Sequence, residues 1–513
     1  MSGVLENESK QNVRESTAFL RLQKFLHESF SIRMLGFAFS RMWIYLGFLN
    51  VALLASTEQA GSLFPHYISS TVVLTLVLFV AGGASESIKR LLEGKVGLAL
   101  TAGLCIAGTL AIPLIDSQTP VGSAVLSFSA IAMGVGNAFS LLLWGNIYGN
   151  LGAPTTASES SLAHSLATLP VPFITLLPGQ VQLTILVFIP VISVIILSQE
   201  MKKQAEDGQL AKEPSAQSDG VEEKALNPKW RTLIIKFMAS SLMLGIIAGL
   251  LHAVYAGGGG PKPLLFQLNL ALPVAALFVG ILMVSFVVFK RHINALFTYH
   301  PVLIFFLLGC FFLPSADKNS VLAYIFVTSG HLCFEIMGWT ITSDFCYRSN
   351  MSNYRIIGLG RGTIVLGILM GVLAGYYVEN YLVVNFENMV SLSFLMAFVL
   401  VITYTTTFTN RDMERIVQDE DEAILSDSPV QEPPRPLSFE EKTLLLAEEY
   451  NISDRAVDVL LLLARGRSAD RIGQELYMSK GTVNTYMRSL YQITGVHSRQ
   501  ELLDLIENIE NKE

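Results

Sequence analysis

Residues 181–197 read VQLTILVFIPVISVIIL, an apolar run without a charged side chain. A helix that crosses a membrane needs about 20 such residues, whereas a helix on a soluble protein shows apolar residues only at every third or fourth position. The whole chain is 51% hydrophobic and 15% charged, whereas soluble proteins carry about 25% charged residues. The sequence therefore predicts a large membrane domain.

Six apolar segments, of which this run is the last, precede residue 198, and six more follow residue 231. A charged segment at 199–231 lies between the two groups. The runs are continuous rather than alternating, which favours helices over the strands of a barrel. The fifth and ninth segments are the weakest, because both are short and bounded by proline. We predict a bundle of about twelve spans, arranged 6+6, at Met34–Ala55, Tyr67–Gly83, Val96–Ile115, Val121–Leu143, Leu162–Leu177, Val181–Leu197, Thr232–Tyr255, Leu264–Phe289, Pro301–Leu313, Val321–Thr340, Ile356–Tyr377 and Met389–Thr407.

The distribution of lysine and arginine predicts the orientation of this bundle, since loops on the cytoplasmic side are rich in both. If the N-terminal segment 1–33 is inside, the inside segments hold nearly all the basic residues near the spans, and the outside loops hold only Lys262 and Lys318. An odd number of spans would reverse the later loops and spoil this pattern. We therefore expect a multi-pass protein of the cytoplasmic membrane with both termini inside.

Two groups of six spans joined by a polar inside loop resemble the major facilitator superfamily of transporters over residues 34–407. The loop after the second span reads GGASESIKR at 82–90, where that family has roughly Gly-x-x-x-Asp-Arg-x-Gly-Arg. Glu86 and Arg90 fit loosely, but the first arginine and the second glycine of the motif are missing. The resemblance implies the transporter fold, and the poor motif argues against active transport.

A few ionisable residues lie inside the predicted spans, where they are costly and usually face the interior of the bundle. Arg41 is in the first span, His252 in the seventh and Arg361 in the eleventh, while His331 and Glu335 are one helical turn apart in the tenth. One interpretation is a ligand-binding cavity lined by Arg41, His331 and Glu335. The other is structural, an internal ion pair or a hydrogen bond between helices.

The remaining chemistry in the membrane part is sparse. The four cysteines lie in or near apolar runs and form no CxxC pair, so we interpret them as small buried hydrophobes rather than metal ligands. No glycine-rich phosphate loop and no catalytic constellation is recognisable in the sequence. We therefore expect no enzymatic activity and no cofactor, and membrane lipid as the surroundings of the domain at 34–409.

The composition changes after residue 409. The segment 410–437 combines an acidic run with several prolines and is typical of an extended linker. From 438 to 513 the pattern is that of a small soluble domain of four helices. Serines precede the expected helices and glycines end them, as caps do, at Ser453, Ser468, Ser479 and Ser498 and at Gly466 and Gly495. A short helix, a tight turn and a longer capped helix form a helix-turn-helix.

Three stretches of this domain are similar to DNA-binding domains of the LuxR/FixJ/NarL type. They are ISDR at 452–455 with the LARG that follows at 463–466, SKGTVNT at 479–485, and GVHSR at 495–499. The resemblance covers residues 452–506 without gaps and implies a bacterial protein that binds double-stranded DNA. Ala456, Asn484 and Tyr486 depart from the residues that are usual in the family.

The charge pattern agrees with this implication, because residues 465–499 hold six basic side chains against two acidic ones, and phosphate contact needs a basic face. Asn484 could bond adenine in the major groove. In this family the last helix often forms a dimer contact, here Leu502, Leu503 and Ile506. The expected DNA-binding residues are Arg467, Arg471, Ser479, Lys480, Thr482, Val483, Asn484 and Arg488. The alternative is a helix-turn-helix used only for contacts with protein.

We arrive at a membrane-bound transcriptional regulator whose transporter-like domain senses a small molecule or a membrane state and controls the DNA-binding domain. The rival hypothesis is an active secondary transporter with a tail that regulates its own gene. A membrane domain that serves only as an anchor is disfavoured, because one span would suffice for that.

Overall fold

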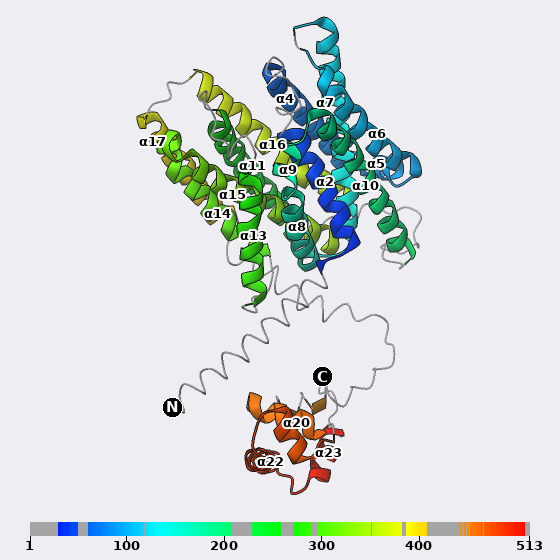
Figure 1. Ribbon diagram of the computed structural model, residues 1–513, viewed down its shortest axis with the longest axis vertical. Coiled ribbons are helices and arrows are strands. Elements are labelled where there is room, and N and C mark those ends of the chain that lie inside the picture. Colours follow the sequence, from blue (N-terminus) through cyan, green and yellow to red (C-terminus); the bar gives the residue numbers. More distant parts are fainter. Residues whose placement is uncertain are drawn as a thin grey trace. The chain divides into compact units, whose positions relative to one another are not determined.

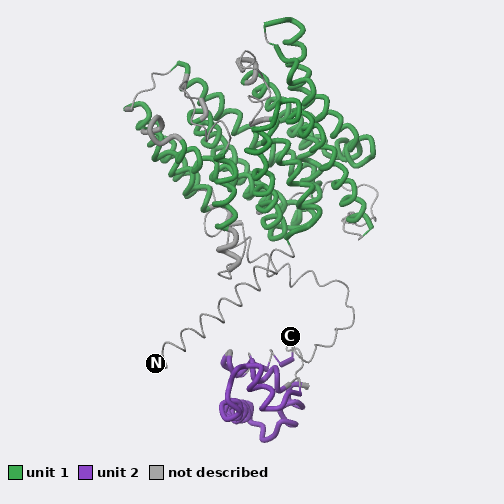
Figure 2. Tube along the Cα trace, viewed as in Figure 1, with its two compact units in different colours: residues 1–418 green, residues 419–513 purple. Residues whose placement is uncertain are grey.

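The computed structural model contains two compact units, residues 1–418 and 419–513, and each is described by itself (Figures 1 and 2). The described residues are all helical, turn or loop, with no strand among them. The linker predicted at 410–437 lies outside the described residues. The structure describes residues 29–49, 60–116, 118–206, 228–257, 270–288, 295–349, 351–381, 386–407, 442–443, 446–447, 450, 452–464 and 466–507.

The first unit is a helical bundle, and each predicted span falls on a helix in it. The first six spans correspond to α2 (Ile32–Leu49), α4 (Ala60–Gly83), α6 (Lys95–Ala111), α7 (Pro120–Gly149), α8 with α9 (Ala153–Thr168 and Val171–Thr175) and α10 (Gly179–Glu206). The last six correspond to α11 (Pro228–Gly257), α13 (Ala271–Val288), α14 (Ala295–Phe312), α15 (Ala316–Arg348), α16 (Asn353–Tyr381) and α17 (Phe386–Thr407). A short helix, α5 (Ser85–Leu92), occupies the loop at 82–90.

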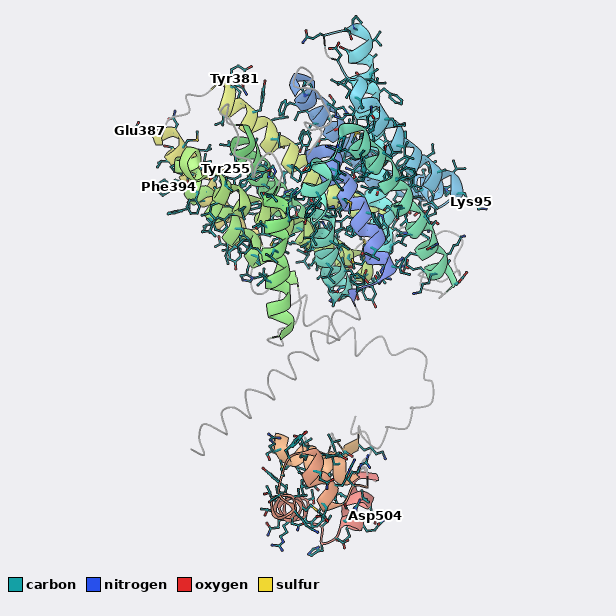
Figure 3. The ribbon with its side chains drawn as sticks, viewed as in Figure 1. Lys95, Tyr255, Tyr381, Glu387, Phe394 and Asp504 are labelled. Carbon is teal, nitrogen blue, oxygen red and sulfur yellow. The ribbon has the colours of Figure 1, made fainter. Side chains whose placement is uncertain are left out.

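Eight of the described helices are long and apolar enough to span a membrane, and 271–282 and 300–312 form shorter apolar helices. The count of twelve spans remains a prediction. Large apolar side chains also cover the outside of the bundle: Phe394 of α17, labelled in Figure 3, is 73% exposed, as is Phe173 of α9. A soluble protein would not expose so many, so the unit is the membrane-embedded part of a multi-pass protein.

The two groups of six helices, which we call the first half and the second half, meet through several helix pairs. α4 packs against α16, and α8 packs against α13 and α15. Hydrogen bonds join the halves at the end that we predict to be cytoplasmic. Asn353 Nδ2 at the start of α16 donates to the side-chain oxygens of Asn146 (3.0 Å) and Asn150 (2.9 Å) of α7. In the same region Ser343 Oγ of α15 donates to the carbonyl of Tyr148 at 2.6 Å.

Glycines permit the closest helix contacts, because only a residue without Cβ lets two backbones approach. A Cβ at Gly371 of α16 would lie 2.1 Å from the carbonyl oxygen of Ile246 in α11, and one at Gly358 would lie 2.6 Å from the amide nitrogen of Gly82 in α4. One edge of α16 is therefore fitted to the second half and another to the first.

Three other glycines inside the predicted spans differ in role. Gly134 and Gly136 of α7 do lie against α4 and α6, where an added Cβ would come within 2.6 Å and 2.8 Å of neighbouring atoms. Gly103 of α6 has nothing within 4 Å of such a Cβ. Spacing within an apolar run does not tell which face of the helix meets a neighbour.

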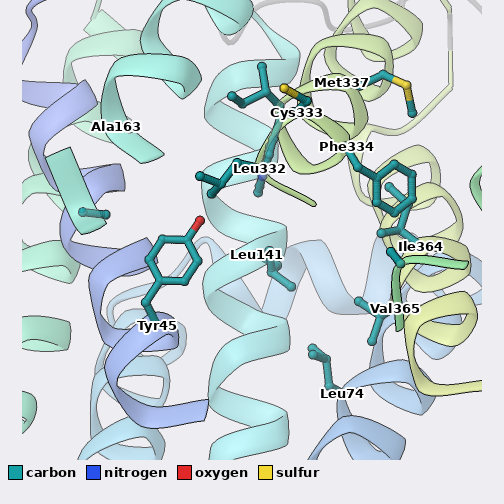
Figure 4. Close-up of a cluster of buried hydrophobic side chains, with 14 of the residues drawn as sticks. Tyr45, Leu74, Leu141, Ala163, Leu332, Cys333, Phe334, Met337, Ile364 and Val365 are labelled. Atoms are coloured by element: carbon teal, nitrogen blue, oxygen red, sulfur yellow. The ribbon is translucent and has the colours of Figure 1, made fainter. Parts of the chain in front are cut away.

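The core between the helices is apolar and includes the cysteines. Figure 4 shows part of it, with Tyr45 of α2, Leu141 of α7 and Leu332 of α15 turned toward the same region. Cys105, Cys310, Cys333 and Cys346 are all buried, which agrees with their interpretation as small hydrophobes.

The second unit has the four predicted helices, α20 (Asp454–Ala464), α21 (Ala469–Glu475), α22 (Lys480–Thr494) and α23 (Arg499–Glu507). The caps are confirmed where the hydrogen bonds are seen. Ser468 and Ser479 accept from the amides of Arg471 and Thr482, and Gly495 ends α22 in the left-handed conformation at φ +72°. The core consists of residues such as Leu460, Ile472, Val483 and Leu490. Ile493 is 45% exposed, because it lies at the edge of the buried stripe that contains Leu490 and Thr494.

Candidate functional site

The exposed side of α22 is the candidate DNA-binding surface. Lys480, Thr482, Asn484 and Arg488 are exposed there, as is the cap Ser479. Val483, which the sequence placed among the DNA-contacting residues, is fully buried at 0% exposure. Its neighbours in the sequence point outward while it packs in the core, so Val483 holds the helix in place and cannot reach a base.

The basic residues around this surface form ion pairs with acidic neighbours. Arg471 Nε lies 3.1 Å from Glu475 Oε1, Arg467 lies 3.7 Å from the same oxygen, and Lys480 Nζ lies 2.8 Å from Asp470 Oδ2. All three cations are more than half exposed, and exposed pairs contribute at most about 1 kcal/mol. The same side chains can therefore leave these carboxylates for DNA phosphates at little cost.

The last helix, α23, is fixed to the rest of its own domain. Leu502 and Ile506 are fully buried in the domain core, so they cannot form the dimer contact that the resemblance implied. Of the three predicted residues only Leu503 keeps some exposure. Arg499 donates from Nη2 to the carbonyl of Leu463 at 3.1 Å and so fastens α23 to α20.

A variant of the capping box starts α23, in which the glutamate bonds the amide of the residue before the cap. The Ser498 hydroxyl accepts from the amide of Glu501 at 3.2 Å, and a Glu501 carboxylate oxygen accepts from the amide of His497 at 2.9 Å. The hydrogen bond from the His497 amide, together with that from the Ser498 hydroxyl, lowers the pKa of the Glu501 carboxyl. The serine that the sequence identified as a cap thus acts together with a glutamate that it did not identify.

In the membrane unit, a buried polar cluster lies where the two halves meet. Its centre is an ion pair within the second half, in which Arg361 Nη2 of α16 donates to Glu335 Oε2 of α15 at 2.5 Å. Arg361 is 2% exposed and Glu335 8%. The sequence interpretation left open whether Glu335 belongs to a ligand site or to an internal ion pair; an ion pair is present, and Arg361 is the partner.

Arg41 of α2 approaches the cluster from the first half. Its guanidinium carbon lies 5.5 Å from the ring centre of Trp339, and that of Arg361 lies 4.7 Å from the same ring. It is close enough to Glu335 and Arg361 to interact with their charges. The two arginines, one from each half, thus share the indole of Trp339.

The predicted ligand residue His331 lies at the margin of this cluster. Its ring is 5.8 Å, centre to centre, from that of His252 in α11, whose Nε2 is 3.0 Å from the Tyr324 hydroxyl. The structure therefore places Arg41 and Glu335, which come from different halves, in one cluster. His331 instead faces His252 of α11.

His164 of α8 belongs to the same cluster and was not singled out from the sequence. It is 1% exposed, with its ring 5.7 Å from that of Phe37. The available signal was the polar stretch at 158–165: in the structure α8 starts at Ala153, nine residues before the predicted span, and buries these polar groups. A polar helix enclosed by apolar ones does not resemble a membrane span in sequence.

A second buried ionic group lies near the start of α2. Arg33 donates from Nε to one Glu159 oxygen at 2.9 Å and from Nη2 to the other at 2.5 Å, while its Nη1 reaches Glu200 of α10 at 2.7 Å. Arg33 is paired with both carboxylates of the group, and these ion pairs link α2, α8 and α10.

Comparison with known proteins identifies the domain type of the second unit and the fold of the first. The family described as bacterial regulatory proteins, luxR family, matches residues 450–506, and the second unit is therefore a LuxR-type helix-turn-helix domain. No curated protein matches the chain.

Among solved structures, a bacterial homologue of the iron transporter ferroportin, in its outward-facing state, is similar at 16% identity and TM-score 0.51. The likeness covers 77% of this chain and 99% of that one. The same homologue soaked with iron gives 14% identity and TM-score 0.52 over the same shares. A human organic anion transporter follows at 15% identity and TM-score 0.48, covering 73% of this chain and 99% of that one. The first unit thus has a transporter-like fold, fused to a LuxR-type DNA-binding domain.

Proposed function

We propose that this protein is a membrane-bound transcriptional regulator, in which the transporter-like unit senses a small molecule and controls DNA binding by the LuxR-type domain. The observation that carries the proposal is the joining of the two units in one chain. The membrane unit has a transporter-like fold, and a cluster of buried ionisable residues lies where its halves meet. We expect it to lie in the cytoplasmic membrane, with both termini inside, where DNA is accessible, and to act without a cofactor or catalytic activity of its own.

The buried polar cluster supports a sensing role because it contains groups from both halves. Arg41 belongs to the first half, and Glu335 and Arg361 to the second. A ligand that contacts both sides would bind differently when the halves move apart, and only a difference in affinity between two states can shift their equilibrium.

The test compares a promoter reporter with solute transport in the same protein. Candidate solutes are screened for a response of the reporter in cells, and each active solute is then assayed for gradient-driven accumulation in proteoliposomes. We expect a reporter response without accumulation. Accumulation driven by an ion gradient would replace the sensor with the rival, a secondary transporter with an autoregulatory DNA-binding tail.

Orientation is tested separately. Alkaline phosphatase, which is active only outside the cytoplasm, is fused after Thr409 and, as a control, in the predicted outside loop at Lys262. The first fusion should be inactive and the second active. The opposite pattern would place the LuxR-type domain outside and refute the DNA-binding role.

A further inference from the structure

The buried polar cluster between the halves has more positive than negative charge. Arg41 and Arg361 are both cations, and Glu335 is the only carboxylate that pairs with either among the described residues. With the histidines neutral, the cluster carries one positive charge in excess. A charge in a membrane interior is costly unless a counter-charge accompanies it, so the cluster is one negative charge short of balance.

The hydrogen-bonding groups of the cluster are also incomplete. Among the described residues, Arg361 Nε and Nη1, Arg41 Nε and Trp339 Nε1 are buried without a hydrogen-bond partner. Buried donors of this kind are normally satisfied. Each of these four nitrogens can only donate, so what they lack is an acceptor.

His164 adds one group of the opposite kind. Its Nδ1 lies 2.6 Å from the carbonyl oxygen of Ser160, which can only accept, so Nδ1 carries the proton. The Nε2 of the neutral ring is then an acceptor, and it too is buried without a partner among the described residues.

Aromatic rings surround these groups. The ring of Phe37 lies 4.8 Å from that of Trp339, 5.1 Å from that of Tyr148 and 5.8 Å from that of Trp144. A molecule that reached the two guanidinium groups would place the rest of its body against these rings. The surroundings therefore suit an apolar or aromatic body rather than a sugar or a nucleotide.

We propose that the cluster is a binding site for an organic monocarboxylate, held by Arg41 of the first half and Arg361 of the second. The planar carboxylate fits the donor fork of an arginine, and its single charge balances the single excess charge, which a phosphate dianion would exceed. This rests on the proposed function, because it names the class of ligand that the regulator senses. The carboxylate joins the two halves through their arginines, with the indole Nε1 donor of Trp339 beside it.

The test uses the purified full-length protein and two carboxylates, benzoate and hexanoate, each beside its uncharged amide at constant ionic strength. Binding is followed through the unfolding temperature, which a ligand of the folded state raises in a saturable manner. We expect at least one carboxylate to raise it and neither amide to do so. If each amide stabilises the protein as much as its carboxylate, or if neither carboxylate has an effect, the assignment is wrong.

Three variants locate the site. Arg41→Gln removes a cation that has no ion-pair partner among the described residues, and it should raise the apparent Kd at least tenfold. The matched control Arg231→Gln, at an exposed arginine near the start of α11, should leave the Kd unchanged. Glu335→Gln keeps the shape and removes the competing negative charge, so it should tighten carboxylate binding. A purely structural ion pair predicts instead that Glu335→Gln lowers the unfolding temperature and leaves binding unchanged, which would overturn the proposal.

The same variants separate this proposal from the proposed function. Carboxylate binding that depends on Arg41, with no response of the promoter, would support the site and refute the sensor. A promoter that responds to another compound equally well in the wild type and in Arg41→Gln would support the sensor and refute the site.

Discussion

Replacing Val483 by alanine tests which face of α22 packs in the core, because the sequence placed this residue on the DNA and the structure places it in the core. The change removes two methyl groups from a fully buried side chain. At about 0.8 kcal/mol for each buried carbon group, plus the cavity left behind, the cost is about 2–3 kcal/mol. A domain of roughly 60 residues has a free energy of unfolding of about 3–9 kcal/mol, so the variant should lose a large part of it.

The assay is urea unfolding of residues 438–513, which contain a hydrophobic core of their own, together with selection of preferred DNA sequences. Val483→Ala should unfold at clearly lower urea and, where still folded, select the same sequences as the wild type. Asn484→Ala is the matched control at the next position, exposed on α22; it should change stability by less than about 0.5 kcal/mol and shift the sequences selected. If Val483→Ala instead keeps its stability and alters the preferred sequence, the packing of α22 described above is wrong.

Three further changes test other features. Glu501→Gln should reduce the acid sensitivity of the same fragment. Because the pKa of the capping carboxyl is lowered in the folded domain, the carboxylate contributes stability at pH values above its ordinary pKa of 4.5, and this contribution is lost as the pH falls. Wild type and variant should therefore differ in urea midpoint at pH 7 and converge near pH 2. Tyr477→Gly should raise the free energy of unfolding by about 1 kcal/mol, since Tyr477 holds a φ of +54° while 97% exposed; no gain in urea unfolding would show that the turn is not strained. In the full-length protein, Gly371→Ala should lower the unfolding temperature because its Cβ meets the backbone of α11, whereas Gly103→Ala, with open space around its Cβ, should leave it equal or higher; equal losses in both would contradict the helix contact.

Each apolar run that was predicted as a span falls on a helix, because long apolar runs have few alternatives in lipid. The sequence interpretation misjudged α8, where the polar residues at 158–161 are buried by neighbouring helices and so raise the apparent polarity of a helix that is not exposed to water. In the same way, His331 and Glu335 share one face of α15, but which residue of another helix meets that face depends on the packing of helices distant in sequence. The pairing of Glu335 with Arg361 could not be read from either residue alone.

In the small domain the opposite holds, because caps and turns are local. Ser468, Ser479 and Gly495 could be placed from short-range patterns, and the structure confirms them. What the sequence could not decide was the direction of individual side chains on α23. Leu502 and Ile506 look alike whether they face a second copy or their own core, and only their burial in the domain core distinguishes the two.

The position of Arg361 on α16 has a mechanical consequence. Between Gly358, fitted to α4, and Gly371, fitted to α11, the helix has backbone contacts on both sides and little room to slide along either. A force applied to the guanidinium group would therefore be transmitted to α4 and α11 rather than shift α16 lengthwise. Movement of α16 relative to α7 would strain the side-chain hydrogen bonds of Asn353 at the start of α16. An event deep in the bundle would therefore first loosen a few side-chain contacts at its margin.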